Sequence, residues 1–212
     1  ILFFNEDPVH AIECRVRTPF GADVCWYDPW LNELAAAETD DGGVRLRLSP
    51  YQMMILKAGN SGAKRLWQPE KAAPVESEGG WTLSMIPAGE TEPSVRLNLP
   101  ALTNLCAPEL YPHFSGTMLY ECAFTLDAPV ACLEIDLGQD YETAQVFLNG
   151  REAGVRIAPP YVFRIDGDSA RAGENRLLVR VVNTLGNKMR DSFSMSMPME
   201  PTGLLGPVTL RL

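Results

Sequence analysis

Apolar and polar residues alternate strictly in several short stretches of this chain. Thr117–Leu126 is the longest of them, and one side of it carries five apolar residues: Met118, Tyr120, Cys122, Phe124 and Leu126. Val44–Leu48 and Val95–Leu99 alternate in the same way. A period of two places successive side chains on opposite faces of an extended backbone, so each stretch predicts a half-buried β-strand.

Other strand-like stretches follow, bounded by Gly, Pro, Asn and Asp. They are Ile1–Asn5, His10–Arg17, Asp23–Tyr27, Met53–Lys57, Trp81–Met85, Cys132–Leu137, Thr143–Leu148, Val162–Ile165, Arg176–Asn183 and Val208–Leu212. Asn149-Gly150 predicts a type I′ hairpin turn between Thr143–Leu148 and Gly154–Ile157, because both turn residues need a positive φ. The expected helix content is one turn around Pro108. The fold class is therefore all-β, a sandwich or jelly roll.

The stretch Gly59-Asn60-Ser61-Gly62 is typical of a linker or sharp connection. It divides the chain into a small antiparallel β unit over residues 1–60 and a larger unit over 61–212. The first unit holds four or five expected strands, too few for a large core, so we expect it not to fold alone. Its apolar side chains would then need a partner surface: Phe3, Phe4, Val24, Trp26, Leu46, Leu48, Met54 and Leu56.

Composition narrows the function classes. The 212 residues carry a net charge of −9, and 18 Lys and Arg are scattered singly. This pattern argues against nucleic acid as a partner, because phosphate binding needs a basic stripe. The apolar fraction of 46% is that of a globular protein, and no apolar run approaches the ~20 residues that cross a bilayer, so no membrane association is expected.

The five cysteines, an odd number, lack the CxxC spacing of zinc sites. They are Cys14, Cys25, Cys106, Cys122 and Cys132. We interpret them as reduced, buried thiols, which favours a cytoplasmic location or an organism that makes few disulfides. The chain lacks an initiator Met and opens inside an apolar stretch, so we expect a fragment of a longer protein.

Four stretches of the second unit together resemble a known family. An aromatic-Ser-Gly-Thr turn leads to a Tyr in Phe114–Tyr120, and Ala144–Gly150 has the pattern A-x-V-x-x-N-G. Gly173–Asn183 and Pro201–Leu210 have the patterns G-E-N-x-L-x-V-x-V-x-N and P-x-G-L-x-G-P-V-x-L. In order and spacing they resemble the galactose-binding-like jelly roll of glycoside hydrolase family 2 and of the α-L-rhamnosidase-like family 106 group.

The first unit resembles the small β segment that follows the catalytic barrel in such enzymes, where it would form the end of a β-sandwich. This looser match rests on Phe4-Asn5-Glu6, Tyr27-Asp28-Pro29-Trp30 and Leu48-Ser49-Pro50-Tyr51. The resemblance implies a non-catalytic carbohydrate-binding or scaffolding module of a multidomain glycoside hydrolase, with glycan or the catalytic domain as its partner. A purely structural interaction domain without sugar affinity is the alternative. A free-standing small enzyme is a third, weaker hypothesis.

Catalytic residues are not predicted in this segment. Glycosidases need two carboxyl groups across a sugar cleft. The candidates are Glu121, Glu134, Asp136, Glu142, Asp166 and Asp191. Glu134 and Asp136 alternate with apolar residues, which is typical of a solvated sheet face. No cofactor is predicted either, and the acidic turn Asp166-Gly167-Asp168, the one position for a structural calcium, is interpreted as a plain turn.

Sugar binding needs an aromatic face beside planar polar groups. Loops with both are expected at the rim of the sandwich, and their candidate carbohydrate-binding residues are Tyr111, His113, Tyr141, Glu142, Tyr161, Arg190 and Asp191. A core or loop-anchoring role competes for each of them, most strongly for Tyr161 beside its two prolines. The Met-rich run Ser192–Met199 is either an edge strand or a surface that docks on a neighbouring domain.

Overall fold

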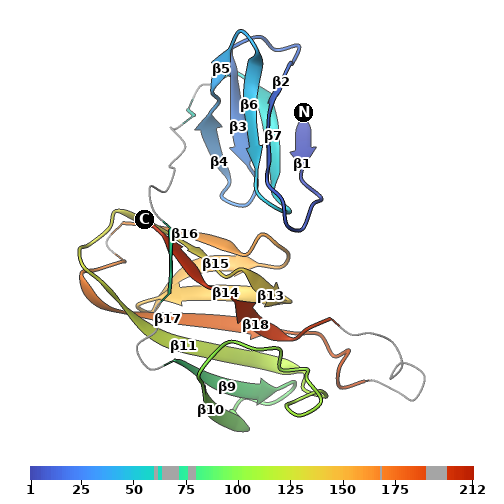
Figure 1. Ribbon diagram of the computed structural model, residues 1–212, viewed down its shortest axis with the longest axis vertical. Coiled ribbons are helices and arrows are strands. Elements are labelled where there is room, and N and C mark those ends of the chain that lie inside the picture. Colours follow the sequence, from blue (N-terminus) through green and yellow to red (C-terminus); the bar gives the residue numbers. More distant parts are fainter. Residues whose placement is uncertain (60–61, 64–71, 76–79, 168, 190–199) are drawn as a thin grey trace. The chain divides into compact units, whose positions relative to one another are not determined.

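The computed structural model describes residues 1–59, 62–63, 72–75, 80–167, 169–189 and 200–212. The chain divides into two compact units, Ile1–Gln68 and Pro69–Leu212. Within the described residues every regular element is a strand, which confirms the all-β class (Figure 1). In these ranges there is no helix of the length and apolarity that a membrane span requires.

The first unit is a small two-layered β-sandwich. Its strands are β1 (Leu2–Phe4), β2 (Ile12–Val16), β3 (Val24–Asp28), β4 (Glu33–Ala36), β5 (Thr39–Asp40), β6 (Gly43–Leu48) and β7 (Met53–Ala58). One sheet has the order β1-β7-β3-β4 and the other β2-β6-β5. The unit has seven strands in two sheets, not the four or five that we expected. The difference arises because the sequences of β4 and β5 show no strand-like alternation of apolar and polar residues.

The core of this unit is its own. It contains Val24, Trp26, Ala35, Val44, Leu46, Leu48, Met54 and Leu56. Six of the eight apolar residues that we expected to need a partner surface are therefore buried between the two sheets. Phe3 packs on this core, with its ring 5.7 Å from that of Trp26 in an edge-to-face arrangement, whereas Phe4 is 47% exposed.

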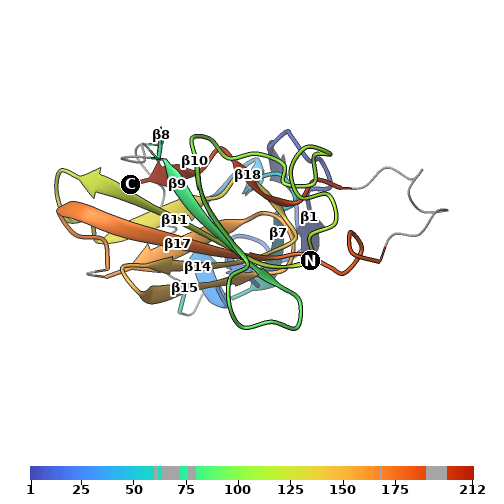
Figure 2. The ribbon, with the colours of Figure 1, turned by 90° about the horizontal axis from the view of Figure 1, so that it is seen from below.

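The second unit is the jelly-roll sandwich. Its strands are β8 (Ala72–Pro74), β9 (Trp81–Pro87), β10 (Val95–Leu99), β11 (Gly116–Leu126), β12 (Cys132–Asp136), β13 (Gln139–Tyr141), β14 (Thr143–Leu148), β15 (Arg151–Arg156), β16 (Val162–Asp166), β17 (Gly173–Val182), β18 (Gly203–Gly206) and β19 (Thr209–Arg211). A sheet of order β10-β9-β11-β17-β14-β15 faces one of order β16-β12-β19-β8, and β13 pairs with β18. Figure 2 shows the long strands of the larger sheet from below.

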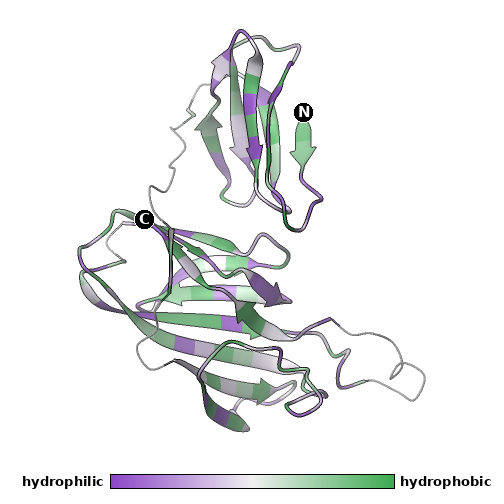
Figure 3. Cartoon of the chain, viewed as in Figure 1, coloured by the Kyte–Doolittle hydropathy of each residue, from purple (hydrophilic) through white to green (hydrophobic). Residues whose placement is uncertain are grey.

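The alternation of the longest strand is confirmed. In β11 all five apolar residues of the predicted inner side are buried, among them Met118 and Tyr120 at 0% exposure. They join one cluster with inward residues of the other strands, such as Phe163 and Val179. Figure 3 shows the resulting mixture of apolar and polar positions along the strands.

The Asn149-Gly150 hairpin is also confirmed. Asn149 has φ 52° and Gly150 has φ 81°, and Leu148 pairs with Arg151 directly across the turn. The partner strand therefore begins at Arg151, not at the predicted Gly154, because a two-residue turn starts the pairing at once. Gly154 lies beside a shift of register, with φ 138°.

Two other expectations need correction. The segment around Pro108 contains turns and no helical turn. The thiols are free, but only Cys25 and Cys122 are buried, and Cys14 is exposed because it lies on the edge strand β2. Ser192–Met199 lies outside the described residues, and so does Asp168 of the acidic turn.

Candidate functional site

Three of the predicted binding loops meet at one end of the larger sheet. Thr117 at the start of β11 and Thr143 at the start of β14 both pair with Val182 at the end of β17. The loops that precede β11, follow β17 and precede β14 must therefore emerge side by side. We call this end of the second unit the rim, made of residues 100–115, 140–142 and 183–189, together with Tyr161 and residues 200–203.

Asn183 ties the first two rim loops together. Its amide nitrogen donates to the main-chain oxygen of Phe114 at 3.0 Å, and its amide oxygen accepts from the Gly116 N–H at 2.8 Å. Gly116 has φ 154°, and a Cβ there would lie 2.1 Å from the Ile86 oxygen. Glycine is therefore the residue that permits this close approach of β11 and β9.

A network of buried polar groups connects the rim loops to one another. The Asn187 amide, 4% exposed, donates to the Thr202 hydroxyl at 2.9 Å. The Thr202 N–H in turn donates to the Asn104 amide oxygen at 2.9 Å, and the Lys188 N–H donates to the Ser115 hydroxyl at 3.2 Å. Satisfied buried polar groups fix loop conformation, so the rim is preorganised.

The fold brings Tyr161 into contact with Glu142, next to Tyr141, although 19 positions separate Tyr161 from Glu142 in the sequence. The Tyr161 hydroxyl donates to the main-chain oxygen of Glu142 at 2.5 Å, and Thr184 donates from its hydroxyl to the Glu142 carboxylate at 3.0 Å. Tyr161 is only 7% exposed, so its ring packs in the core and its hydroxyl positions Glu142. Glu142 is exposed and Tyr141 half-buried, so both side chains are accessible.

Asp140 is the unusual group beneath this rim. It is 3% exposed, and neither carboxylate oxygen has a hydrogen-bond partner among the described residues. Burial raises its pKa to about 7, because a desolvated carboxylate is disfavoured. Burial, together with the charges of Asp140 and Glu142, raises the pKa of Tyr161 to about 12. The rim thus encloses a buried carboxyl group whose charged form is disfavoured.

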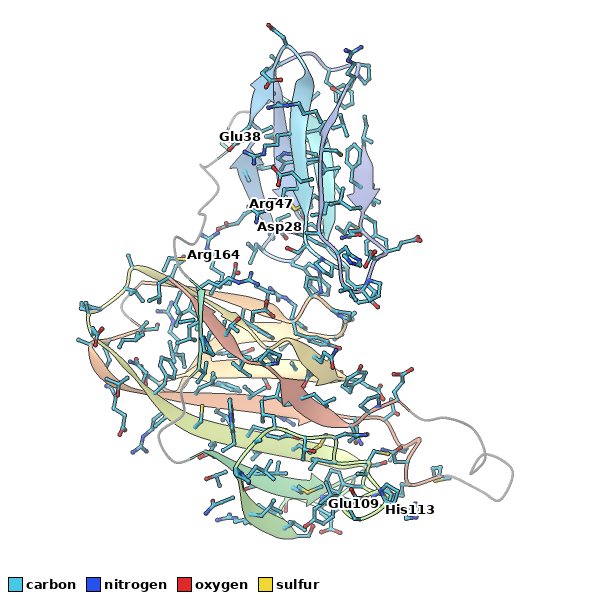
Figure 4. All side chains as sticks on the ribbon, viewed as in Figure 1. Asp28, Glu38, Arg47, Glu109, His113 and Arg164 are labelled. Atoms are coloured by element: carbon cyan, nitrogen blue, oxygen red, sulfur yellow. The ribbon has the colours of Figure 1, made fainter. Side chains whose placement is uncertain are left out.

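Tyr111 and His113 lie on the neighbouring loop. Tyr111 is half-buried and packs against the core cluster, and its main chain bonds Leu105 and Phe114. His113 is exposed, as Figure 4 shows, on the same loop as Glu109. Tyr111 therefore presents only part of its ring to solvent, whereas His113 is fully available as a polar contact.

Two predicted binding residues remain, and one contributing residue was not predicted. Arg190 and Asp191 lie outside the described residues. Thr184, which orients Glu142, was missed, because a hydroxyl just after a strand has no pattern of its own. Within the described part of the chain, no cluster of three His, Cys, Asp or Glu side chains has a geometry suited to a metal ion.

Glu134 and Asp136 do not form a simple solvated face. Arg211 of the adjacent strand β19 donates to Glu134 at 2.7 Å and to Asp136 at 2.5 Å, and the two acids are only 18% and 22% exposed. β12 pairs with β19, and this pairing brings the Arg211 guanidinium between the two carboxylates. Both acids therefore serve as ion-pair partners within the sheet.

No family model matches the sequence. A rhamnosidase from Novosphingobium sp. PP1Y superimposes on 99% of this chain with a TM-score of 0.73 and 24% identity. This chain has the fold of a segment of a glycoside hydrolase. The fold that the motifs predicted is thereby confirmed over both units.

Among curated proteins, one from Formosa agariphila named "Putative beta-glucuronidase" is 30% identical over 95 residues, which are 43% of this chain. The chain spans 22% of the rhamnosidase chain and 8% of the curated protein. The similarity therefore concerns a β-sandwich region, which is a small part of each whole protein.

Proposed function

We propose that this chain is a non-catalytic β module of a multidomain glycoside hydrolase and that its rim contacts glycan. The fold match over 99% of the chain supports the origin of the module, because it spans both units in one piece. The observation that supports the contact is Glu142, an exposed carboxylate held at 3.0 Å by Thr184 and fixed through its main chain by Tyr161. A preoriented planar acceptor beside Tyr141 is what a sugar hydroxyl pair requires.

The non-catalytic part of the proposal rests on how the acids are used. Glu134 and Asp136 share one guanidinium, and Asp140 is enclosed beneath the rim. A glycosidase needs two carboxyl groups about 5–10 Å apart and open to the same glycosidic bond. These three acids are committed to ion pairing or burial, and Asp166 is paired with Arg164. Glu121 and Glu142 lie on different elements, within β11 and in the loop before β14. We therefore expect the chain to leave chromogenic glycosides unhydrolysed.

A glycan array followed by titration calorimetry of the hit with the full chain tests the proposal. Glu142→Gln should weaken binding at least about tenfold, since a hydrogen bond to a charged group contributes about 1.5–3 kcal/mol. Tyr141→Ala should also weaken binding, because it removes the aromatic face beside that carboxylate. Glu174→Gln is the matched control, an exposed carboxylate at the opposite end of β17, and should leave affinity unchanged.

Two results would contradict the glycan contact. Binding that is unaffected by both rim variants places the contact elsewhere. Absence of any hit on the array leaves the module with a purely structural role, which the buried network around Asn187 and Thr202 also fits.

A further inference from the structure

Strand β2 lies at the edge of its sheet in the first unit. Some of its apolar side chains, which point to the core side of that sheet, are exposed. In β2, Ile12, Cys14 and Val16 pair with Leu48, Leu46 and Val44 of β6, and paired residues point to the same face. The three β6 residues are buried, at 1%, 5% and 2% exposure. Ile12, however, is 39% exposed, and Cys14 is also exposed. Val16 is half-buried and packs against the core of this unit, so the opposite sheet covers that end of β2 and leaves Ile12 and Cys14 uncovered.

The backbone edge of β2 is uncovered as well. Its sheet has the order β2-β6-β5, so within the described residues β2 has β6 as its one sheet neighbour (Figure 1). Natural proteins protect such edges with short strands, charged side chains, proline, bulges or inward-pointing charges. β2 has five residues, and its two charged side chains, Glu13 and Arg15, have opposite signs. Ile12–Val16 contains no proline, its pairing with β6 runs without a shift of register, and its inward residues are apolar. Among the residues that the structure describes, no strand pairs with the outer edge of β2, and Ile12 and Cys14 lie exposed beside this edge.

The sequence of β2 is complementary to itself. It runs Ile12-Glu13-Cys14-Arg15-Val16, with one acid and one base placed symmetrically about Cys14. In an antiparallel pair of two copies centred on Cys14, Glu13 of each copy lies opposite Arg15 of the other, and Ile12 lies opposite Val16. A strand with charges of one sign would repel its copy, whereas this one attracts it.

The neighbouring charges fit the same arrangement. On the outer face, Arg15 lies opposite Arg45 of β6, and Glu13 lies opposite Arg47, which Figure 4 labels. A second β2 would add Glu13 beside the Arg15–Arg45 pair and so place an acid next to two bases. The existing ion pairs, Arg15 with Asp40 and Arg45 with Glu13, are all about half exposed, so they can adjust without large cost.

We propose that β2 is a self-association edge, through which two copies of this chain pair antiparallel about Cys14. The pair makes one continuous sheet, β5-β6-β2 joined to β2-β6-β5 of the second copy, and brings Ile12 and Val16 of the two copies together on the inner face. Five residues per copy form a small interface, well below the ~1,200 Å² of a stable complex, so the dissociation constant should be on the order of 100 μM. Two-fold symmetry closes the assembly at a dimer.

Sedimentation equilibrium of the full chain at about 10–500 μM, a range that brackets this constant, tests the proposal. Glu13→Arg gives a strand with two bases, and Arg15→Glu gives one with two acids. Each variant alone should dimerise at least about tenfold more weakly, because two like-charge pairs replace two opposite-charge pairs. An equimolar mixture of the two variants should associate again, since every base then faces an acid. Glu6→Arg, the same charge change at an exposed position outside β2, should dimerise as the unchanged chain does.

Cys14 supplies a second, independent measurement. Residues directly opposite in an antiparallel pair have Cα atoms about 4.5–5.5 Å apart, within the reach of a disulfide. Mild oxidation with copper phenanthroline and dissolved oxygen, which removes two electrons and two protons from two thiols, should give a covalent dimer. Cys14→Ser should give none, although Cys106 and Cys132 remain.

Three outcomes would overturn the proposal. The first is a chain that stays monomeric at about 500 μM, several times the expected constant. The second is a dimer that both single charge variants leave intact, which would place the contact on another surface. The third is a mixture of the two variants that fails to associate while each variant keeps the circular dichroism spectrum of the unchanged chain.

Discussion

The hydroxyl of Tyr161 donates a hydrogen bond of 2.5 Å to the main-chain oxygen of Glu142. This contact joins the residue before β16 to the loop between β13 and β14, and it sets the direction in which Glu142 leaves the rim. A buried tyrosine whose polar end holds a loop fits the loop-anchoring role that its two neighbouring prolines suggested.

Tyr161→Phe should therefore lower the free energy of unfolding by about 1 kcal/mol, the usual net value of a neutral hydrogen bond. The ring would still fill its place in the core, so the larger loss that follows from a cavity should be absent. Urea denaturation followed by tryptophan fluorescence measures the change. A loss of more than about 3 kcal/mol would mean that the ring packing itself is disturbed.

Asp140 should make the free energy of unfolding fall as pH rises. Its folded-state pKa is about 7, above the value of 3.8 expected without burial. Between these values the folded chain holds a proton that the unfolded chain has released, so the contribution is complete below about pH 4 and is lost by about pH 7. Asp140→Asn should remove this slope and make the protein more stable than the unchanged chain at pH 8, by about 2–4 kcal/mol.

Thermal denaturation of both proteins between pH 5 and 8 gives the comparison. Parallel stability curves for the two proteins would show that a partner already neutralises the Asp140 charge in the folded state.

Arg211 should matter more than its place near the end of the sequence suggests. Arg211→Ala leaves Glu134 and Asp136 close together, partly buried and without their cation, so we expect a loss of about 2 kcal/mol. Arg176→Ala is the control, because its pair with Glu174 is 79% and 56% exposed and should contribute less than about 1 kcal/mol. Equal losses in chemical denaturation would refute the distinction between the two pairs.

Gly116 should resist substitution. In Gly116→Ala the new Cβ would lie 2.1 Å from the Ile86 oxygen, so β9 and β11 would have to separate. We expect a loss above about 3 kcal/mol and a lower yield of folded protein. Gly150→Ala, with nothing within 4 Å of the new Cβ, should cost only about 1 kcal/mol of turn strain. Similar melting temperatures for the two variants would contradict this account.

The first unit should be unable to fold by itself. Among its described residues, the apolar core cluster has eight members, and β2 leaves Ile12 and Cys14 uncovered. Residues 1–68 expressed alone should show no cooperative thermal transition, whereas residues 69–212 should show one. A sharp melting curve from the short piece would make it an autonomous domain.

Prediction from sequence succeeded where one local pattern decides the structure. The period of two in Thr117–Leu126 determines which side of β11 is buried, and Asn149-Gly150 determines a turn through its positive φ angles. It failed at β4, because Glu-Leu-Ala-Ala has no β signal and becomes a strand only by pairing with β3. It also missed β13 and β18, which have only three and four residues and no alternation of apolar and polar positions.

The candidate site shows the same limit. The loops at the rim were predicted from their aromatic and planar polar residues, and register does bring three of them together. The role of each residue was not predictable, because burial of Tyr161 and Asp140 and the bond from Thr184 to Glu142 depend on chain segments up to 42 residues apart.

The position of β19 inside its sheet affects how the chain folds while it is being synthesised. This three-residue strand, Thr209–Arg211, lies between β12 and β8 in the order β16-β12-β19-β8. Until the ribosome has released these residues, β8 has no neighbour in that sheet, and one edge of β12 stays open to other chains. The sheet β16-β12-β19-β8 therefore closes only after Thr209–Arg211 have emerged, and a nascent chain stalled before these residues would be prone to aggregate.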